Sequence, residues 1–150
     1  MCDDACTDAV NFLQGIQYGK DPKHTQIVGT CKHFVANSME NWYNYSRHNY
    51  DAKVSKADLA DYYFPAFKAC VMEGKAMSIM CSCASEFTFP VLRATRHLGC
   101  AHHACSADCT LCQRLADNAV NGVPMCANTG MLNETLRNSW KFDGYVTSDW

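Results

Sequence analysis

The sequence has almost no net charge and no long apolar run. Its 150 residues include 13 basic and 15 acidic side chains, so the formal charge is -2. A chain this close to neutrality offers no basic surface of the kind that binds nucleic acid or anionic membranes, and we expect neither partner. No apolar stretch reaches the roughly 20 residues of a membrane-spanning helix. Residues 1–7 also lack the basic and apolar segments of a signal peptide.

Cysteine, by contrast, is in excess. There are 11 cysteines, and an odd number leaves at least one thiol unpaired, which is unusual for a secreted protein. Zinc binding is one interpretation, since cysteine and histidine are the usual ligands of zinc in proteins. The spacing matches no strong paired-cysteine pattern, however, and contains a single C-x-x-C. The ligands available to such a site are Cys100, Cys105, Cys109 and Cys112 with His97, His102 and His103.

Outside residues 83–117 the apolar pattern predicts alternating helices and strands. Residues 10–16 have helical spacing, and Gly19 is placed to end that helix. Ser55 is a suitable N-cap for a second helix, which Gly74 ends. A third helix is expected around residues 131–136, buried strands are expected at 26–31, 76–81 and 145–146, and a long loop is expected at 37–50.

This order predicts an α/β fold with a parallel sheet. A complete (β/α)8 barrel takes about 250 residues, so three strands would form only part of one. In such folds ligands bind at the carboxyl ends of the strands. Polar residues follow the expected strands at three places, which are Lys32-His33, Ser82 and Asp149. We therefore expect the side chains of Lys32, His33 and Asp149 to face one ligand.

Together these motifs resemble glycoside hydrolase family three, which contains β-glucosidases and β-xylosidases. The resemblance extends from about Gly19 to Trp150 with one interruption. It implies that residues 1–82 and 118–150 form part of the N-terminal (β/α)8 barrel domain of that family, with about three βα units. The matching segments are Cys31–Phe34, Arg47–Ala52, Asp61–Cys70, Met80–Ser82, Asn118–Asn128 and Ser148–Trp150.

The resemblance implies roles for six residues. Asp149 would be the catalytic nucleophile, which attacks the anomeric carbon of a sugar and forms a glycosyl-enzyme. Lys32 and His33 would hydrogen-bond hydroxyls of the non-reducing-end sugar, and Arg47 would serve the same subsite. Nearby cations suit this chemistry, because they keep a nucleophilic carboxylate ionised. The walls of the pocket would include Met80 and Trp150.

The resemblance also implies a substrate. Family members are retaining exo-glycosidases that remove terminal β-xylosyl or β-glucosyl residues from oligosaccharides, without a cofactor or metal. Plant cell-wall oligosaccharides such as those of xylan are the expected substrates, and a secreted location is expected from the family. Residues 31–34, 40–42 and 80–82 resemble the xylosidase branch, whereas the ending Ser-Asp-Trp is more typical of glucosidases, so both specificities stay open.

We expect this chain to be inactive by itself. A retaining mechanism needs a second carboxyl group about 5 Å from the nucleophile. In the family that group comes from a later domain. None of the glutamates of this chain falls at a matching strand end; they are Glu40, Glu73, Glu86 and Glu134.

Residues 83–117 interrupt the family pattern. Family members continue Met-Cys-Ser directly into Tyr-Asn-Ala-Val-Asn-Gly, whereas here Ser82 is followed by Cys83 and the pattern resumes at Asn118. Translation of an intron that splits a tyrosine codon after its first base would give cysteine at the left edge. The right edge would read Ala116-Asp117, and the reading frame would be preserved. We therefore expect a retained intron, with a genuine insertion in a loop as the alternative.

Two other classes of function stay open. One is a zinc-binding or interaction protein built on the cysteine-rich segment 83–117. The other is a sugar-binding protein without catalytic activity, which would use Lys32 and His33. An oligosaccharide is the partner expected in the second case and in the enzymatic case.

Overall fold

The computed structural model describes residues 4–47, 50–82 and 118–149. Its first element is helix α1, Asp4–Tyr18, which ends as predicted at Gly19, where φ is +55°. Such a positive φ costs glycine little, because glycine has no Cβ to clash with the backbone. Helix α1 packs against helix α3 (Phe64–Met72). No helix in the described ranges is long and apolar enough to cross a membrane.

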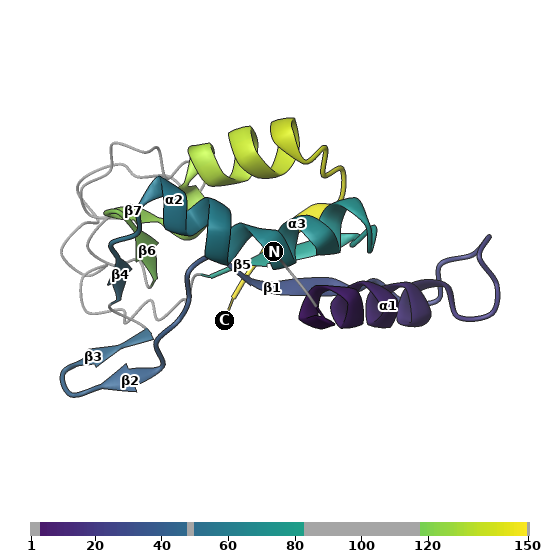
Figure 1. Cartoon of the computed structure of the whole chain (residues 1–150), viewed down its shortest axis with the longest axis horizontal. Coiled ribbons are helices and arrows are strands. Elements are labelled where there is room, and N and C mark those ends of the chain that lie inside the picture. Colours follow the sequence, from purple (N-terminus) through teal and green to yellow (C-terminus); the bar gives the residue numbers. More distant parts are fainter. Residues whose placement is uncertain (1–3, 48–49, 83–117, 150) are drawn as a thin grey trace, which may run out of the picture.

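A three-stranded parallel sheet forms the centre of the structure. Its strands are β1 (Thr30–Phe34), β5 (Ser78–Cys81) and β8 (Tyr145–Ser148), in the order β1-β5-β8. Figure 1 shows helices α1 and α3 beside these strands. A helix precedes each of these three strands in the chain. The α/β class and the parallel sheet predicted from the sequence are therefore confirmed.

The first strand lies later in the chain than the sequence predicts. We expected it at residues 26–31, but pairing with β5 begins at Thr30, opposite Ser78. Ile27 and Val28 stay outside the sheet and are 57% and 40% exposed. Their β-branched side chains favour a strand, but the neighbouring strand offers them no partner. As a result, Lys32 and His33 lie within the strand and not after it.

One long helical segment spans residues 56–72, as the sequence predicts. It consists of α2 (Lys56–Asp58), the π-helical turn η2 (Leu59–Tyr63) and α3. The predicted N-cap is present, since the Asp58 N–H donates to Ser55 Oγ at 3.0 Å. Leu59 is buried, but Tyr62, which helical spacing would place on the same face three residues later, is 77% exposed. The π-helical turn shifts the phase of the helix there, which explains this difference.

Aromatic side chains fill the core between the sheet and the helices. The Phe34 ring lies 5.1 Å from that of Phe67 and 5.9 Å from that of Trp140, measured between centroids. Leu136 is wholly buried in the predicted third helix, η5 (Gly130–Ser139). Two disulfides join the sheet to its surroundings; they are Cys31–Cys70, which links β1 to α3, and Cys81–Cys126, which links β5 to the 3-10 turn η4 (Met125–Ala127).

The predicted long loop at 37–50 contains regular structure. Strands β2 (Asn41–Trp42) and β3 (Tyr45–Ser46) pair as an antiparallel hairpin, which projects from the body in Figure 1. Strands of two residues are too short to produce a recognisable period in the sequence. A second small sheet has the order β4-β6-β7, with strands Asp51–Ala52, Ala119–Val120 and Val123–Pro124.

Candidate functional site

A β-bulge interrupts the pairing of β1 with β5. Cys31 is opposite Ile79 and Phe34 is opposite Cys81, so two residues of β1 stand where β5 has one. Phe34 of β1 and Ile79 of β5 are wholly buried in the core. They fix the pairing of the two strands on either side of the bulge. Bulges of this kind change the direction of side chains and occur often beside active sites.

The two residues in the bulge are Lys32 and His33, and their counterpart on β5 is Met80. Lys32 is exposed, while His33 and Met80 are half-buried. Successive residues of a regular strand point to opposite faces of the sheet. The bulge breaks this alternation, so three of the residues that the sequence singled out are neighbours on adjacent strands.

Asp149 meets His33 at the carboxyl end of the sheet. It follows β8 directly, and its N–H donates to the Cys81 carbonyl at 3.2 Å, which continues the pairing of Cys81 with Ser148. Asp149 Oδ2 lies 3.2 Å from His33 Nε2. The two side chains are 17% and 24% exposed, so the contact is partly shielded from water. A protonated Nε2 donates this hydrogen bond to the carboxylate.

Arg47 lies at the base of the β2–β3 hairpin. Its N–H donates to the Glu40 carbonyl at 2.8 Å, and its Nη1 lies 3.5 Å from Glu40 Oε2. The Arg47 carbonyl in turn accepts the Asn118 N–H at 3.3 Å. The pairing with Glu40 was not anticipated from the sequence. Trp150 and the predicted zinc ligands lie outside the described residues.

Sequence reasoning gave no role to the buried side chains of Ser82 and Asn118. Asn118 Nδ2 donates to Ser82 Oγ and also to the Val35 carbonyl at 3.2 Å. Ser82 Oγ lies 3.3 Å from the carbonyls of both Phe34 and Val35. The contact between Ser82 and Asn118 joins residues 36 positions apart in the sequence. The signal for such a network is a small polar residue placed directly after a buried strand.

Polar contacts also anchor the turn that follows Asn118. Asn121 Oδ1 accepts the Val54 N–H at 3.0 Å, and its Nδ2 donates to the Val54 carbonyl at 2.9 Å. Burial raises the pKa of Asp51, but hydrogen bonds from Lys53 and from the Gly122 N–H outweigh it, so the pKa lies below its ordinary value. The ionised carboxylate therefore holds this turn against β4.

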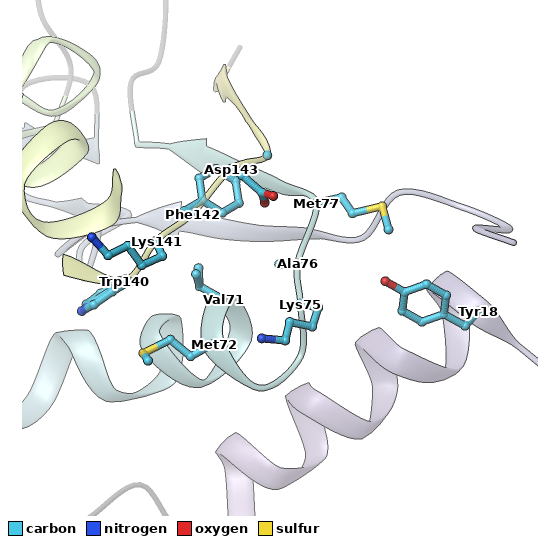
Figure 2. A pocket seen from close by; sticks show the side chains of 11 residues that line it. Tyr18, Val71, Met72, Lys75, Ala76, Met77, Trp140, Lys141, Phe142 and Asp143 are labelled. Carbon is cyan, nitrogen blue, oxygen red and sulfur yellow. The ribbon is translucent and has the colours of Figure 1, made fainter. Parts of the chain in front are cut away.

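The opposite end of the sheet contains a hollow of about 540 Å³. Figure 2 shows its wall, which includes Tyr18 from α1 and Val71 from α3. Residues 75–77 and 140–144, which precede β5 and β8, also line it. In parallel α/β proteins the amino ends of the strands contribute to stability and the carboxyl ends to chemistry. We therefore place the candidate site at His33 and Asp149 and not in this hollow.

Within the described residues no three His, Cys, Asp or Glu side chains are grouped closely enough to hold a metal ion. The predicted zinc site is a separate question, because its ligands fall between His97 and Cys112. Zinc binding by that segment stays a prediction.

Comparison with known proteins finds relatives that are named as xylosidases. It is 35% identical over 142 residues to a probable exo-1,4-beta-xylosidase (bxlB) of Aspergillus clavatus, which covers 93% of this chain and 14% of the relative. It is 32% identical over 143 residues to beta-D-xylosidase 3 of Arabidopsis thaliana, with 94% and 14% covered. No family model matches the chain.

Solved structures show the same likeness. The chain resembles a GH3 exo-beta-xylosidase, XlnD, in complex with a xylobiose aziridine probe; the TM-score is 0.69, the identity 28%, and 96% of this chain and 15% of that one are covered. It also resembles beta-glucosidase 3B of Thermotoga neapolitana, with a TM-score of 0.63, 25% identity, and 99% and 15% covered.

The proteins in these comparisons are glycoside hydrolases that act on xylosides or glucosides by name. The chain belongs to glycoside hydrolase family three. It spans about 14% of the length of the curated relatives that it matches.

Proposed function

We propose that this chain contains the nucleophile and part of the sugar-binding subsite of a retaining β-xylosidase or β-glucosidase. Asp149 would attack the anomeric carbon of a terminal sugar and form the glycosyl-enzyme, while the bond to the leaving-group oxygen breaks and an acid protonates that oxygen. Water would then release the sugar with its original configuration.

The contact between His33 Nε2 and Asp149 Oδ2, at 3.2 Å, is the observation that supports this proposal most directly. It brings a hydrogen-bond donor to sugar hydroxyls within reach of a carboxylate, although 116 positions separate the two residues in the sequence. Lys32 and Met80 lie beside His33 because of the bulge. Donors fixed in this way can position a sugar ring for attack.

Arg47 would bind the same sugar from the hairpin side. Its partner in this structure is Glu40, so a sugar hydroxyl would share or replace that partner. Trp150 would form an aromatic wall near the leaving group. The substrates would be terminal non-reducing β-D-xylosyl or β-D-glucosyl residues of oligosaccharides, with xylan as the polysaccharide source. The protein would act outside the cell.

The architecture that fits this function is part of a (β/α)8 barrel. Residues 1–82 and 118–150 would supply about three βα units, in agreement with three parallel strands that each follow a helix. Residues 83–117 would be an addition to this domain. The hydrogen bond between Ser82 and Asn118 supports that view, because it brings the two ends of the added segment together.

Sequencing the cDNA across the codons for Ser82 and Asn118 tests the origin of the added segment. A processed message that reads Ser-Tyr-Asn would identify residues 83–117 as a retained intron. A message that keeps all of these codons in every transcript would mean a genuine insertion.

We propose that the chain by itself does not hydrolyse glycosides, because it shows no second carboxyl group matched to the acid role. Hydrolysis of nitrophenyl β-xyloside and β-glucoside by the purified chain tests this. Turnover above background that Asp149→Asn abolishes would contradict it. Binding of xylose or glucose without turnover, lost in His33→Ala, would match a sugar site that lacks its acid.

A chimera tests the catalytic role in a complete enzyme. The matching region of the Aspergillus clavatus relative would be replaced by residues 1–82, one tyrosine and residues 118–150 of this chain. We expect the chimera to hydrolyse xylosides, and Asp149→Asn to reduce kcat by at least about a thousandfold. An active Asp149→Asn chimera would exclude Asp149 as the nucleophile. Glu134→Gln, on the surface of η5, is the matched control.

A further inference from the structure

We propose that Ser82 and Asn118 are positioning residues, which hold His33 against Asp149 by binding the backbone that follows His33. This proposal rests on the function proposed above and assigns it two further residues. Ser82 and Asn118 are 1% and 2% exposed. Because water is excluded around them, buried polar groups need partners inside the protein, and the Ser82 hydroxyl and the Asn118 amide nitrogen are directed at specific acceptors. Asn118 Oδ1 has no hydrogen-bond partner among the described residues.

Three donors hold the chain directly after His33. The Ser82 N–H donates to the Phe34 carbonyl at 2.8 Å, and Ser82 Oγ lies 3.3 Å from the carbonyls of Phe34 and Val35. Asn118 Nδ2 donates to the Val35 carbonyl at 3.2 Å. A bulge leaves a residue unpaired and bends its strand. The bonds that follow it therefore determine where the strand resumes and in which direction His33 points.

The same end of β5 also holds Asp149. The carbonyl of Cys81, the residue before Ser82, accepts the Asp149 N–H at 3.2 Å. Cys81 thus binds the Asp149 N–H on one side of β5, and Ser82 binds the backbone after His33 on the other side. A movement of Ser82 would therefore change the distance between the two site residues. Since hydrogen bonds weaken steeply away from ideal geometry, a small movement is enough to break their contact.

Asn118 supports Ser82 in this role. Its Nδ2 donates to Ser82 Oγ, and the same nitrogen donates to the Val35 carbonyl. This pair of acceptors sets the orientation of the amide, because a flipped side chain would place its oxygen against the Val35 oxygen. The Ser82 hydroxyl, as acceptor from Asn118, is left with its own proton for the carbonyls of β1.

Ser78, the first residue of β5, provides a matched control for Ser82, which directly follows that strand. It is wholly buried like Ser82, but its Oγ has no hydrogen-bond partner among the residues that the structure describes. Ser78→Ala and Ser82→Ala thus remove the same atom from the two ends of one segment, residues 78–82. Only the second substitution removes contacts with the backbone after His33.

The test uses the whole chain labelled with nitrogen-15 at histidine. The His33 Nε2 resonance is assigned by its loss in His33→Gln, and its movement upon Asp149→Asn is recorded. We expect a clear movement in the unaltered background and in Ser78→Ala. In the Ser82→Ala background, Asp149→Asn should change the His33 Nε2 chemical shift by less than about a third of the change seen in the unaltered background. The reason is that the two side chains no longer meet. Ser82→Thr, which keeps the hydroxyl, should restore it.

An unchanged response to Asp149→Asn in a folded Ser82→Ala chain would overturn the proposal. If Ser82→Ala does not fold, as judged from its amide spectrum, Asn118→Ala supplies the same test while Ser82 and its bonds to β1 remain. No sugar is needed for this measurement. Failure of xylose or glucose binding would therefore count against the proposed function, whereas failure of the histidine response would count against the positioning role alone.

Discussion

At the amino end of the β1–β5–β8 sheet, a single side chain binds four backbone groups, whereas at the carboxyl end two side chains from different strands bind each other. The first is Gln17, whose Nε2 donates to the carbonyls of Gly74 and Lys75 and whose Oε1 accepts from Gly29 and Met77. The second arrangement is the contact of His33 with Asp149.

This difference separates a purely structural contact at one end of the sheet from the candidate site at the other. Gln17 is wholly buried and has all of its polar atoms occupied by backbone, so it has no capacity left for a ligand. His33 and Asp149 are partly exposed, and backbone bonds made by Cys81 and Ser82 hold the strands that present them. At the carboxyl end the backbone is satisfied by neighbouring strands, and the side chains remain available.

Removing the amide at the amino end should have the largest effect. Gln17→Ala removes two buried and two partly buried hydrogen bonds to backbone groups, and we expect it to lower the free energy of unfolding by about 3–5 kcal/mol. Urea unfolding monitored by tryptophan fluorescence measures this change. Gln14→Ala is the matched control on the same helix, since Gln14 makes one exposed bond to the Glu73 carbonyl. A loss equal to that of the control would show that Gln17 has no special role.

The disulfide at the carboxyl end should have the next largest effect. Replacing Cys81 and Cys126 together by alanine removes a crosslink between residues 45 positions apart. We expect a loss of about 2–4 kcal/mol, mainly because the unfolded chain gains freedom. Unfolding curves of the two proteins without reductant give the difference. With reductant present, the unfolding curves of the unaltered chain and the double variant should coincide more closely. If the two curves already coincide without reductant, this crosslink does not stabilise the fold.

Two serines, at the start of β5 and directly after it, compare the ends of the sheet directly. Ser82→Ala removes a satisfied hydroxyl, and we expect it to cost about 1–3 kcal/mol. Ser78→Ala removes a buried hydroxyl that has no partner among the described residues, so stability should stay the same or rise by up to about 1 kcal/mol. Thermal unfolding of both variants checks this. Equal losses in the two proteins would contradict the contrast.

The smallest effect should come from Asp51, whose pKa is lowered in the folded chain. Burial opposes this shift, but the Lys53 side chain and the Gly122 N–H outweigh it. Its contribution to stability is therefore complete above the unfolded-chain value of about 3.9 and is lost as the pH falls through the folded value. Solvent screening keeps it below about 1 kcal/mol.

The difference in unfolding free energy between the unaltered chain and Asp51→Asn, measured in urea at pH 7 and near pH 3, tests this prediction. The difference should shrink at the lower pH. A difference that grows upon acidification would give the opposite sign and exclude the proposed anchoring of the turn by this carboxylate.

Periodicity in the sequence was sufficient to predict the helices and the parallel sheet. Gly19 ends α1, Ser55 caps the second helix, and Leu136 is buried in the third, all as expected. These features depend on residues within a few positions of one another, so they are visible in a local pattern. The same reasoning placed the first strand four residues too early, because its start depends on pairing with β5.

Long-range contacts could not be read in this way. Gln17 has the polarity of a surface residue, yet it is buried because the loop before β5 folds over it. Ser82 and Asn118 meet only because segments on either side of residues 83–117 come together. Arg47 was expected at the sugar subsite, and the structure shows its partner to be Glu40, which belongs to a hairpin that the sequence did not reveal.

The sequence by itself was enough to predict candidate site residues and to determine the order of helices and strands that supports them. It also showed the likeness to glycoside hydrolase family three through motifs that stand in order along the chain. Only the tertiary structure decided which of those residues meet. The bulge at Lys32 and His33 exists only relative to β5, and the contact with Asp149 needs β8 on the other side of that strand. Register between strands is a property of their pairing, and no single strand contains it.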